Sequence, residues 1–157
     1  MKILLLVVGK TTDAHIQTLV ADYAKRVGYY VSFDIEVIPE LRNTRGLSEE
    51  QQKSAEGEQI RQALKPGDTV ILLDEHGTEF RSMEYATWLQ KKMASGARRL
   101  VFVVGGPYGF SPEVYALAAG KISLSRMTFS HQMVRLFFVE QLYRAQTILK
   151  GEPYHHE

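Results

Sequence analysis

The chain has 157 residues, of which 45% are hydrophobic and 24% are charged, with a net charge of +1 and no cysteine. This length and composition predict one globular domain spanning residues 1–157, and the missing cysteines exclude disulfides and thiolate chemistry. The near-zero net charge excludes a strongly basic nucleic-acid binder, so any basic face needs clustered arginines, for which the candidates are Arg42/Arg45, Arg98/Arg99 and Arg126/Arg135.

Apolar runs and stretches with helical spacing alternate along the first half of the chain. Residues 3–8 form an apolar run typical of a strand buried on both faces, and residues 31–38 alternate with the period of a strand. Between them, an apolar stripe within residues 12–28 indicates a helix. A capping-box pattern at Ser48 begins a mostly polar helix that runs to Leu64.

The second half of the chain continues this alternation. A tight glycine-rich loop, Gly105–Gly109, follows an apolar strand, and Ser111 and Pro112 suit the N-cap and first position of a short helix. The expected strands are residues 69–73, 100–104 and 122–124, with a turn at 74–77, and the longer helices are residues 82–94 and 131–150. Strands that alternate with helices predict an α/β domain with a mostly parallel sheet flanked by helices.

No segment predicts export or membrane insertion. The apolar run of residues 3–8 is shorter than the roughly 7–15 residues of a secretory signal core, and no cleavage pattern follows it. No later stretch approaches the ~20 apolar residues of a membrane span. Together with the missing cysteines, these features lead us to expect a cytoplasmic protein.

Two nucleotide-binding motifs are imitated but not met. Gly9-Lys10-Thr11 resembles the end of a phosphate-binding loop, but that motif needs a glycine where Leu4 stands. The loop Gly105–Gly109 spells G-G-x-x-G and lies too late in the chain for a dinucleotide fold, which argues against nicotinamide chemistry. Its glycines either let a flat ligand approach the backbone or only form a sharp turn, and both interpretations stay open.

The segment Leu124–His131 places apolar and hydroxyl side chains directly before the last helix. These groups could line a pocket, or Ser130 could cap the helix at the end of a simple connector. The helix that follows is apolar on almost every side between Met133 and Tyr143. A helix of this kind is buried on more than one face, which predicts a homodimer.

The chain ends with Tyr154, His155 and His156, chemically unusual side chains for a terminus, which is commonly disordered. Two adjacent histidines are too few for a zinc site, which usually needs three or four protein ligands, so we expect no metal. The residues alone leave open whether this tail is disordered or takes part in a site.

Six fragments, taken together and in this order, resemble the ribosomal RNA large subunit methyltransferase H family over the whole length of the chain. They are Leu73-Asp74-x-x-Gly77, Gly105-Gly106-Pro107-x-Gly109, Leu124-Ser125-x-x-Thr128, His131-x-x-Val134-Arg135, Glu140-Gln141-Leu142-Tyr143-Arg144-Ala145 and Pro153-Tyr154-His155. That family belongs to the SPOUT superfamily, so the resemblance implies a SPOUT methyltransferase fold with a C-terminal trefoil knot. Knots are too rare for periodicity to suggest one.

The resemblance further implies methyl transfer from S-adenosylmethionine to N3 of a pseudouridine in helix 69 of 23S rRNA, on the assembled ribosome. The family's cofactor positions correspond here to Leu73, Gly105, Leu124, Ser125, Arg126, Met127, Thr128 and Phe129. In SPOUT dimers these loops lie beside the partner subunit, which agrees with the homodimer expected from the last helix.

The chemistry of the implied reaction assigns candidate roles to the remaining polar side chains. The N3 proton must leave, and His131 and His155 are the candidate bases, while Tyr154 positions the target base or stacks on it. The candidates for contact with the RNA are Arg135 and Arg144, which could meet phosphates, and His156. Ser130 and His156 depart from the family, which frequently has proline and can carry arginine at these positions.

Two other functions remain to be weighed against this one. The first is a non-enzymatic, ribosome-associated binding protein, and the second is a flavodoxin-like nucleotide or flavin protein. The late position of the glycine loop argues against the second. The co-occurrence of that loop, residues 124–129 and the tail argues against the first, because a simple binding protein would not need all three.

Overall fold

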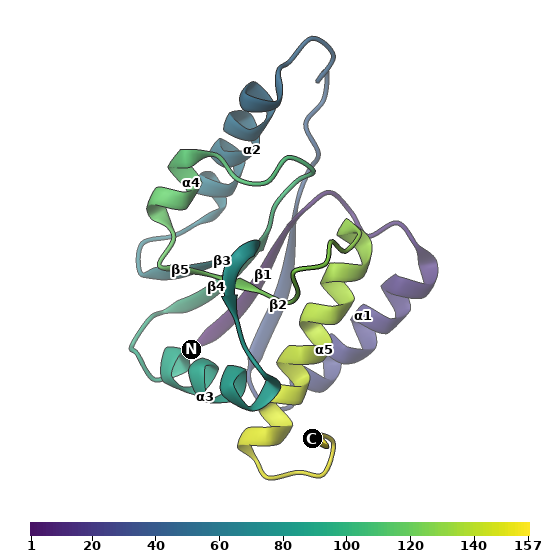
Figure 1. The fold of residues 1–157 in the computed structure, drawn as a ribbon, viewed down its shortest axis with the longest axis vertical. Coiled ribbons are helices and arrows are strands. Elements are labelled where there is room, and N and C mark those ends of the chain that lie inside the picture. The colour runs from purple at the N-terminus through teal and green to yellow at the C-terminus, as the bar shows by residue number, and fades with distance from the viewer.

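The structure is a computed structural model that describes all 157 residues and contains five strands and five helices (Figure 1). In chain order they are β1 (Lys2–Val8), α1 (Ala14–Val27), β2 (Ser32–Ile38), α2 (Glu49–Ala63), β3 (Asp68–Glu79), α3 (Ser82–Met93), β4 (Arg99–Val104), α4 (Pro112–Leu117), β5 (Gly120–Ser123) and α5 (His131–Leu149). Ser48, Ser111 and Ser130 cap α2, α4 and α5 with their side chains. The predicted α/β class is confirmed.

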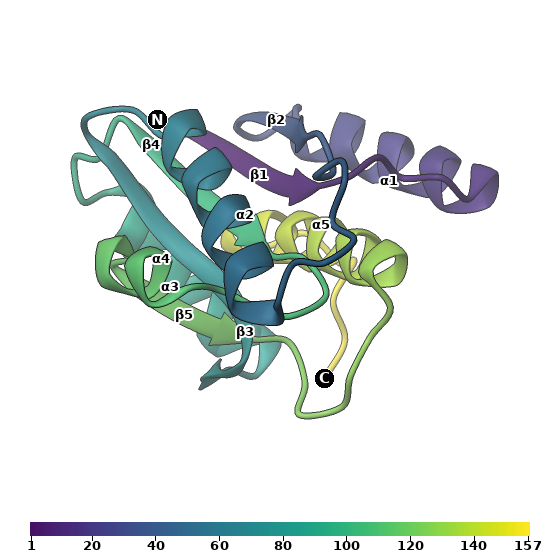
Figure 2. The same cartoon turned by 90° about the horizontal axis from the view of Figure 1, so that it is seen from above.

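The five strands form one parallel sheet in the order β2-β1-β4-β3-β5. Helices α1, α3 and α5 cover one face of the sheet, and α2 and α4 cover the other (Figure 2). Because all strands run in the same direction, each chain segment that leaves a strand does so at the same edge of the sheet. That edge is where the loops of interest to function gather.

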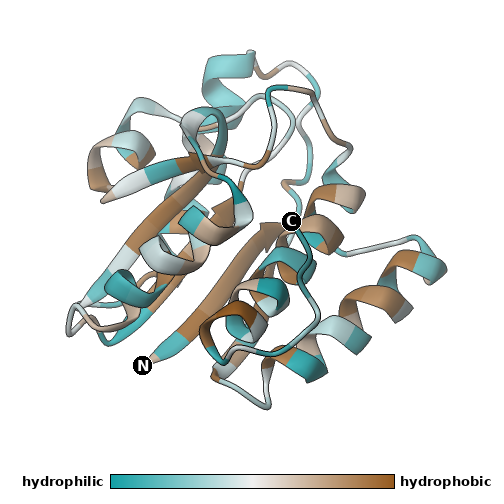
Figure 3. Ribbon diagram, turned by 60° about the horizontal axis from the view of Figure 1, so that its bottom comes forward, coloured by the Kyte–Doolittle hydropathy of each residue, from teal (hydrophilic) through white to brown (hydrophobic).

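The strand period decides which core each side chain joins. In β1, Ile3 and Leu5 face the larger core under α1, α3 and α5, while Leu4 faces the smaller core under α2 and α4. In the larger core, the rings of Phe102 and Phe138 lie 4.8 Å apart between their centroids and join β4 to α5. Figure 3 shows the same pattern, with hydrophobic residues on the strands and on the helix sides that face them.

The turn predicted at residues 74–77 is wrong, because β3 continues through it. The pairing of β3 with β5 changes register between Leu73 and Thr78, as a bulge allows. A Cβ atom at Gly77 would lie 2.5–2.7 Å from three backbone atoms of Ile122. Only glycine lets β5 approach β3 this closely, so Gly77 serves strand packing and not a turn.

Helix α5 lies between α1 and α3, and these two helices cover much of its apolar surface. Phe138, Val139 and Leu142 are fully buried, whereas Phe137 remains 39% exposed and Met127, just before the helix, is 77% exposed. The homodimer and the trefoil knot both stay predictions. None of the helices is long and apolar enough to span a membrane.

Replacing Gly77 by alanine should lower the free energy of unfolding by about 1–3 kcal/mol, the usual range for overpacking, because the new Cβ collides with the backbone of Ile122. Urea denaturation measures the difference. Gly120→Ala is the matched control across the same strand pair, since its Cβ would meet only Ile71 Cδ1 at 3.6 Å. If both variants were as stable as the unaltered chain, this account of Gly77 would be refuted.

Candidate active site

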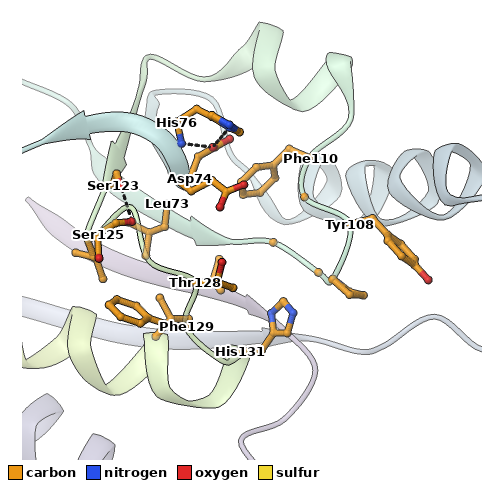
Figure 4. A pocket seen from close by; sticks show the side chains of 18 of the residues that line it. Leu73, Asp74, His76, Tyr108, Phe110, Ser123, Ser125, Thr128, Phe129 and His131 are labelled. Carbon is orange, nitrogen blue, oxygen red and sulfur yellow. Dashed lines mark hydrogen bonds and ion pairs between the residues drawn. The ribbon is translucent and has the colours of Figure 1, made fainter.

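A cavity of about 640 Å³ opens at the carboxyl ends of β3, β4 and β5 (Figure 4). Three segments form most of its wall: the end of β3 from Leu73, the glycine loop Gly105–Gly109 after β4, and residues 123–131 between β5 and α5. Ligands of α/β proteins bind at the carboxyl ends of parallel strands, and this volume suits a small organic molecule.

The glycine loop turns sharply and packs directly against Phe110 and Glu56. Gly109 has a φ of +83°, and its N–H donates to the carbonyl of Gly106 at 3.2 Å. A Cβ atom at Gly105 would lie 2.9 Å from Cε1 of Phe110, and one at Gly106 would lie 2.4 Å from Oε1 of Glu56. The sharp turn is therefore confirmed, and the cavity wall here is bare backbone that a flat ligand can approach.

Glu56 behind this loop is a residue that sequence reasoning missed. Its side chain, from α2, is buried to 4% exposure, and Oε1 has no hydrogen-bond partner. Burial raises the pKa of this carboxyl above its usual range. The one signal in the sequence is weak: Ile60, four residues on, places Glu56 on the buried side of an otherwise polar helix.

A buried carboxylate forms part of the cavity floor at the end of β3. The side chain of Asp74 is 6% exposed and accepts hydrogen bonds from the Tyr115 hydroxyl and from the His76 amide, the latter at 2.8 Å. Burial alone would raise the pKa of Asp74, but these hydrogen bonds and the nearby Lys121 outweigh it and lower the pKa. Tyr115 was not expected from the sequence, because it comes from α4, 41 residues away.

The segment before α5 is ordered by its own hydroxyl groups. The Ser123 hydroxyl donates to the carbonyl of Ser125 at 2.9 Å, and the Ser125 hydroxyl accepts from the Met127 amide at 2.9 Å. Thr128 and His131 lie at the cavity, as Figure 4 shows. Ser130 caps α5, and residues before it line the cavity, so both interpretations of this segment hold. Of the predicted cofactor residues in this segment, those that line the cavity are Leu124, Ser125, Met127, Thr128 and Phe129.

Arg126, expected at the cofactor, and Arg135, expected at the RNA, do not line the cavity. The Arg126 side chain is 85% exposed and pairs with Glu79 at 3.3 Å. Arg135 is 3% exposed and donates to the carbonyl of Val8 at 2.9 Å and to the Thr11 hydroxyl at 3.0 Å. Arg135 thus ties α5 to the end of β1, and its guanidinium does not face solvent where a phosphate would lie.

The tail is ordered, and it packs against the middle of α5 instead of the cavity. The Tyr154 hydroxyl donates to Oε1 of Glu140 at 2.9 Å, and Arg144 bonds the same oxygen at 2.6 Å. Nδ1 of His155 lies 3.1 Å from Arg144, while His156 is exposed. Nine residues of helix separate Glu140 from the start of α5, about 13 Å along the axis. Within one chain, the tail is therefore apart from the start of α5, which lines the cavity, and Figure 1 shows the C-terminus near the opposite end of that helix.

The cavity lining is acidic although the chain is not. Glu49, Asp74 and Glu75 line it against one lysine, Lys53, which pairs with Glu50 at 3.0 Å. A lining of this sign favours a cationic ligand. No group of three or more histidine, cysteine, aspartate or glutamate side chains is arranged to hold a metal ion.

Comparison with known proteins relates this arrangement to a methyltransferase family. The sequence model of a family described as "Predicted SPOUT methyltransferase" matches residues 1–155. Similar curated proteins are named ribosomal RNA large subunit methyltransferase H: those of Phocaeicola vulgatus, Bacteroides fragilis and Flavobacterium psychrophilum are 62%, 60% and 58% identical to this chain. Each match covers 157 residues and the whole of both proteins.

Tyr115→Phe should lower the free energy of unfolding at pH 7 by about 1 kcal/mol, a modest value for a hydrogen bond to a charged group because Tyr115 is 40% exposed. The pKa of Asp74 is lower in the folded chain, so its stabilisation is present above the unfolded pKa of about 3.9 and is lost as the pH falls through the folded pKa. Urea denaturation at pH 7 and near pH 3 should show the difference shrinking. Tyr108→Phe, at an exposed tyrosine of the same cavity, is the control and should change neither value.

Proposed function

The chain belongs to the SPOUT methyltransferase family, and we propose that it methylates large-subunit ribosomal RNA with S-adenosylmethionine as the methyl donor. The target that we propose is N3 of a pseudouridine in helix 69 of 23S rRNA, on the assembled ribosome. The observation that carries the proposal is the acidic cavity of about 640 Å³ at the strand ends, in a chain matched over its whole length by proteins named for this activity.

The residues around the cavity fit S-adenosylmethionine. The bare backbone of the loop from Gly105 lets a flat adenine ring approach closely, and Leu73, Leu124 and Phe129 offer apolar contacts. The ionised carboxylate of Asp74 suits a ligand that carries positive charge. Ser125, Met127 and Thr128 complete the proposed cofactor site, and Arg126 is left out because its side chain points to solvent.

When bound, S-adenosylmethionine supplies a methyl group activated by its sulfonium charge. The walls of the cavity hold the target base so that N3 lies in line with that group, and such positioning supplies much of the acceleration. His131, exposed where α5 meets the cavity, accepts the proton that leaves N3. A positioned base of this kind typically contributes 10²–10⁴-fold.

The tail serves the cavity of a second copy in this proposal. Tyr154 and His155 pack against α5 away from the cavity of their own chain, so they reach a reacting base only across a dimer interface. Met127, in the segment that lines the cavity, and Phe137, on α5, are exposed and offer apolar surface for that interface. Arg144 holds the tail in place, and the exposed His156 contacts the RNA.

Saturating S-adenosylhomocysteine, the reaction product, should raise the melting temperature, because a ligand at 100 times its Kd adds about 2.7 kcal/mol to the folded state. Gly105→Val should abolish the shift, since its side chain collides with Phe110, which lines the cavity, and so displaces the cavity wall. Gly120→Ala, remote from the glycine loop, should keep it. No shift for the unaltered chain would favour the alternative, a non-enzymatic ribosome-associated binding protein.

Ribosomes that carry pseudouridine at the target position should accept methyl faster than ribosomes that carry uridine there. Pseudouridine is attached through carbon and keeps an N1–H donor, and a site built to pair a donor rejects an analogue that lacks it. Mass spectrometry of 23S rRNA fragments after incubation with the protein and S-adenosylmethionine measures both rates. Equal rates would count against this target.

Mixing two inactive variants tests the composite site. A chain that lacks residues 153–157 keeps its cavity, and a Gly105→Val chain keeps its tail. If the tail acts across the dimer, a mixed dimer holds one complete site, so random exchange should restore about a quarter of the unaltered activity. No recovery, with mixed dimers present by native mass spectrometry, would place the tail's action within its own chain.

A further inference from the structure

The structure separates the three arginine pairs that could form a basic face. Arg99 is held by Asp68 in two hydrogen bonds at 2.8 and 2.7 Å, and this pair lies at the amino end of β4, away from the cavity. Arg135 is buried and Arg126 pairs with Glu79. Only in the pair Arg42/Arg45 are both members exposed and without an acidic partner within 4 Å.

These two arginines belong to a shaped loop, residues 41–47, between β2 and α2. Asn43 has a φ of +58° and Gly46 a φ of +86°, and the Leu47 amide donates to the carbonyl of Thr44 at 3.0 Å. The loop stands out from the body of the molecule, at the top of Figure 1. Both arginines of this projecting loop are exposed.

The loop leads directly into the wall of the cavity. It leaves β2 at the carboxyl edge of the sheet and ends at α2, whose residues Glu49 and Lys53 line the cavity. Glu49, two residues after the end of the loop, already lines the cavity. The exposed arginines are thus carried by the segment that leads into the acidic lining.

We infer that the loop of residues 41–47 binds the RNA backbone beside the target base, with Arg42 and Arg45 on phosphates. The acidic cavity that suits a cationic cofactor repels RNA, and the two guanidiniums supply the missing attraction just outside it. Arginine is suited to this task because its planar fork bonds a phosphate through two parallel hydrogen bonds. These contacts set the position of the RNA without reading its sequence. The inference rests on the proposed function.

The inference is tested by measuring ribosome binding of the double variant Arg42→Ala/Arg45→Ala. The control is Lys91→Ala/Arg98→Ala, which removes the same charge from exposed positions near the amino end of the sheet. Sedimentation with purified ribosomes over 50–200 mM salt gives the affinity and its salt dependence. The loop variant should bind about tenfold more weakly near 100 mM, and the slope of log affinity against log salt should fall by about 1.5, or 0.7–0.9 for each lost phosphate contact. The control should match the unaltered chain.

Three outcomes separate this inference from the proposed function. Unchanged affinity and slope for the loop variant, or equal losses in loop variant and control, would overturn the inference. Arg42→Lys/Arg45→Lys should keep most of the slope, because lysine keeps the charge, and a loss as large as with alanine would mean that the loop shape, not its charge, was disturbed. A loop variant that behaves as expected while the unaltered chain transfers no methyl would overturn the proposed function alone. The S-adenosylhomocysteine shift should be the same in all variants.

Discussion

The parallel direction of all five strands is the constraint on which the rest of this structure depends. Because the strands run in one direction, the part of β3 beyond its pairing with β4 and the segments after β4 and β5 lie at one edge. Residues distant in the chain, such as Leu73, Gly105 and Leu124, meet there and form one cavity. The central strands are buried on both faces, which makes this edge a rigid support for the loops that it carries.

Charge is divided between the cavity and its surroundings. Asp74 stays ionised despite its burial because Tyr115 and the His76 amide donate to it. An acidic lining of this kind suits a cationic methyl donor and does not suit an anionic polymer. Binding an anionic polymer needs positively charged side chains near the cavity. The exposed loop between β2 and α2 carries two of them, Arg42 and Arg45. In the proposed function, this division lets a chain with a net charge of only +1 serve a cationic cofactor and an anionic nucleic acid.

Helix α5 links the two parts of the proposed composite site. Its first residue, His131, lies at the cavity, and Glu140, further along it, anchors Tyr154 of the tail. The buried Arg135 between them bonds the end of β1 and so fixes the helix against the sheet. Helix α5 thus carries the cavity at one end and the tail on its side. In the proposed dimer, this arrangement lets the tail of one copy act at the cavity of the other.

Features that depend on neighbours within a few residues can be read from the amino-acid sequence. The strand period of β1, the serine caps of α2, α4 and α5, and the turn at Gly109 all follow from local pattern, and they establish the α/β class and which loops follow the strands. The motif resemblance adds the family. Leu73, Gly105 and Leu124 were predictable as cavity residues because a position at or directly after the carboxyl end of a parallel strand already specifies the edge on which it lies, whereas Tyr115, from α4, was not.

Contacts between side chains far apart in the chain follow from the packing of the fold and are not visible in the sequence. Arg135 bonds a carbonyl 127 residues away, and Tyr115 bonds Asp74 from 41 residues away. Gly77 lies within a strand and not in a turn because β5 packs on it. No local pattern reports such contacts, because an arginine in a buried hydrogen-bond network and an arginine free for phosphate have the same local sequence signal. Packing of the helices on the sheet buries one and leaves the other in solvent.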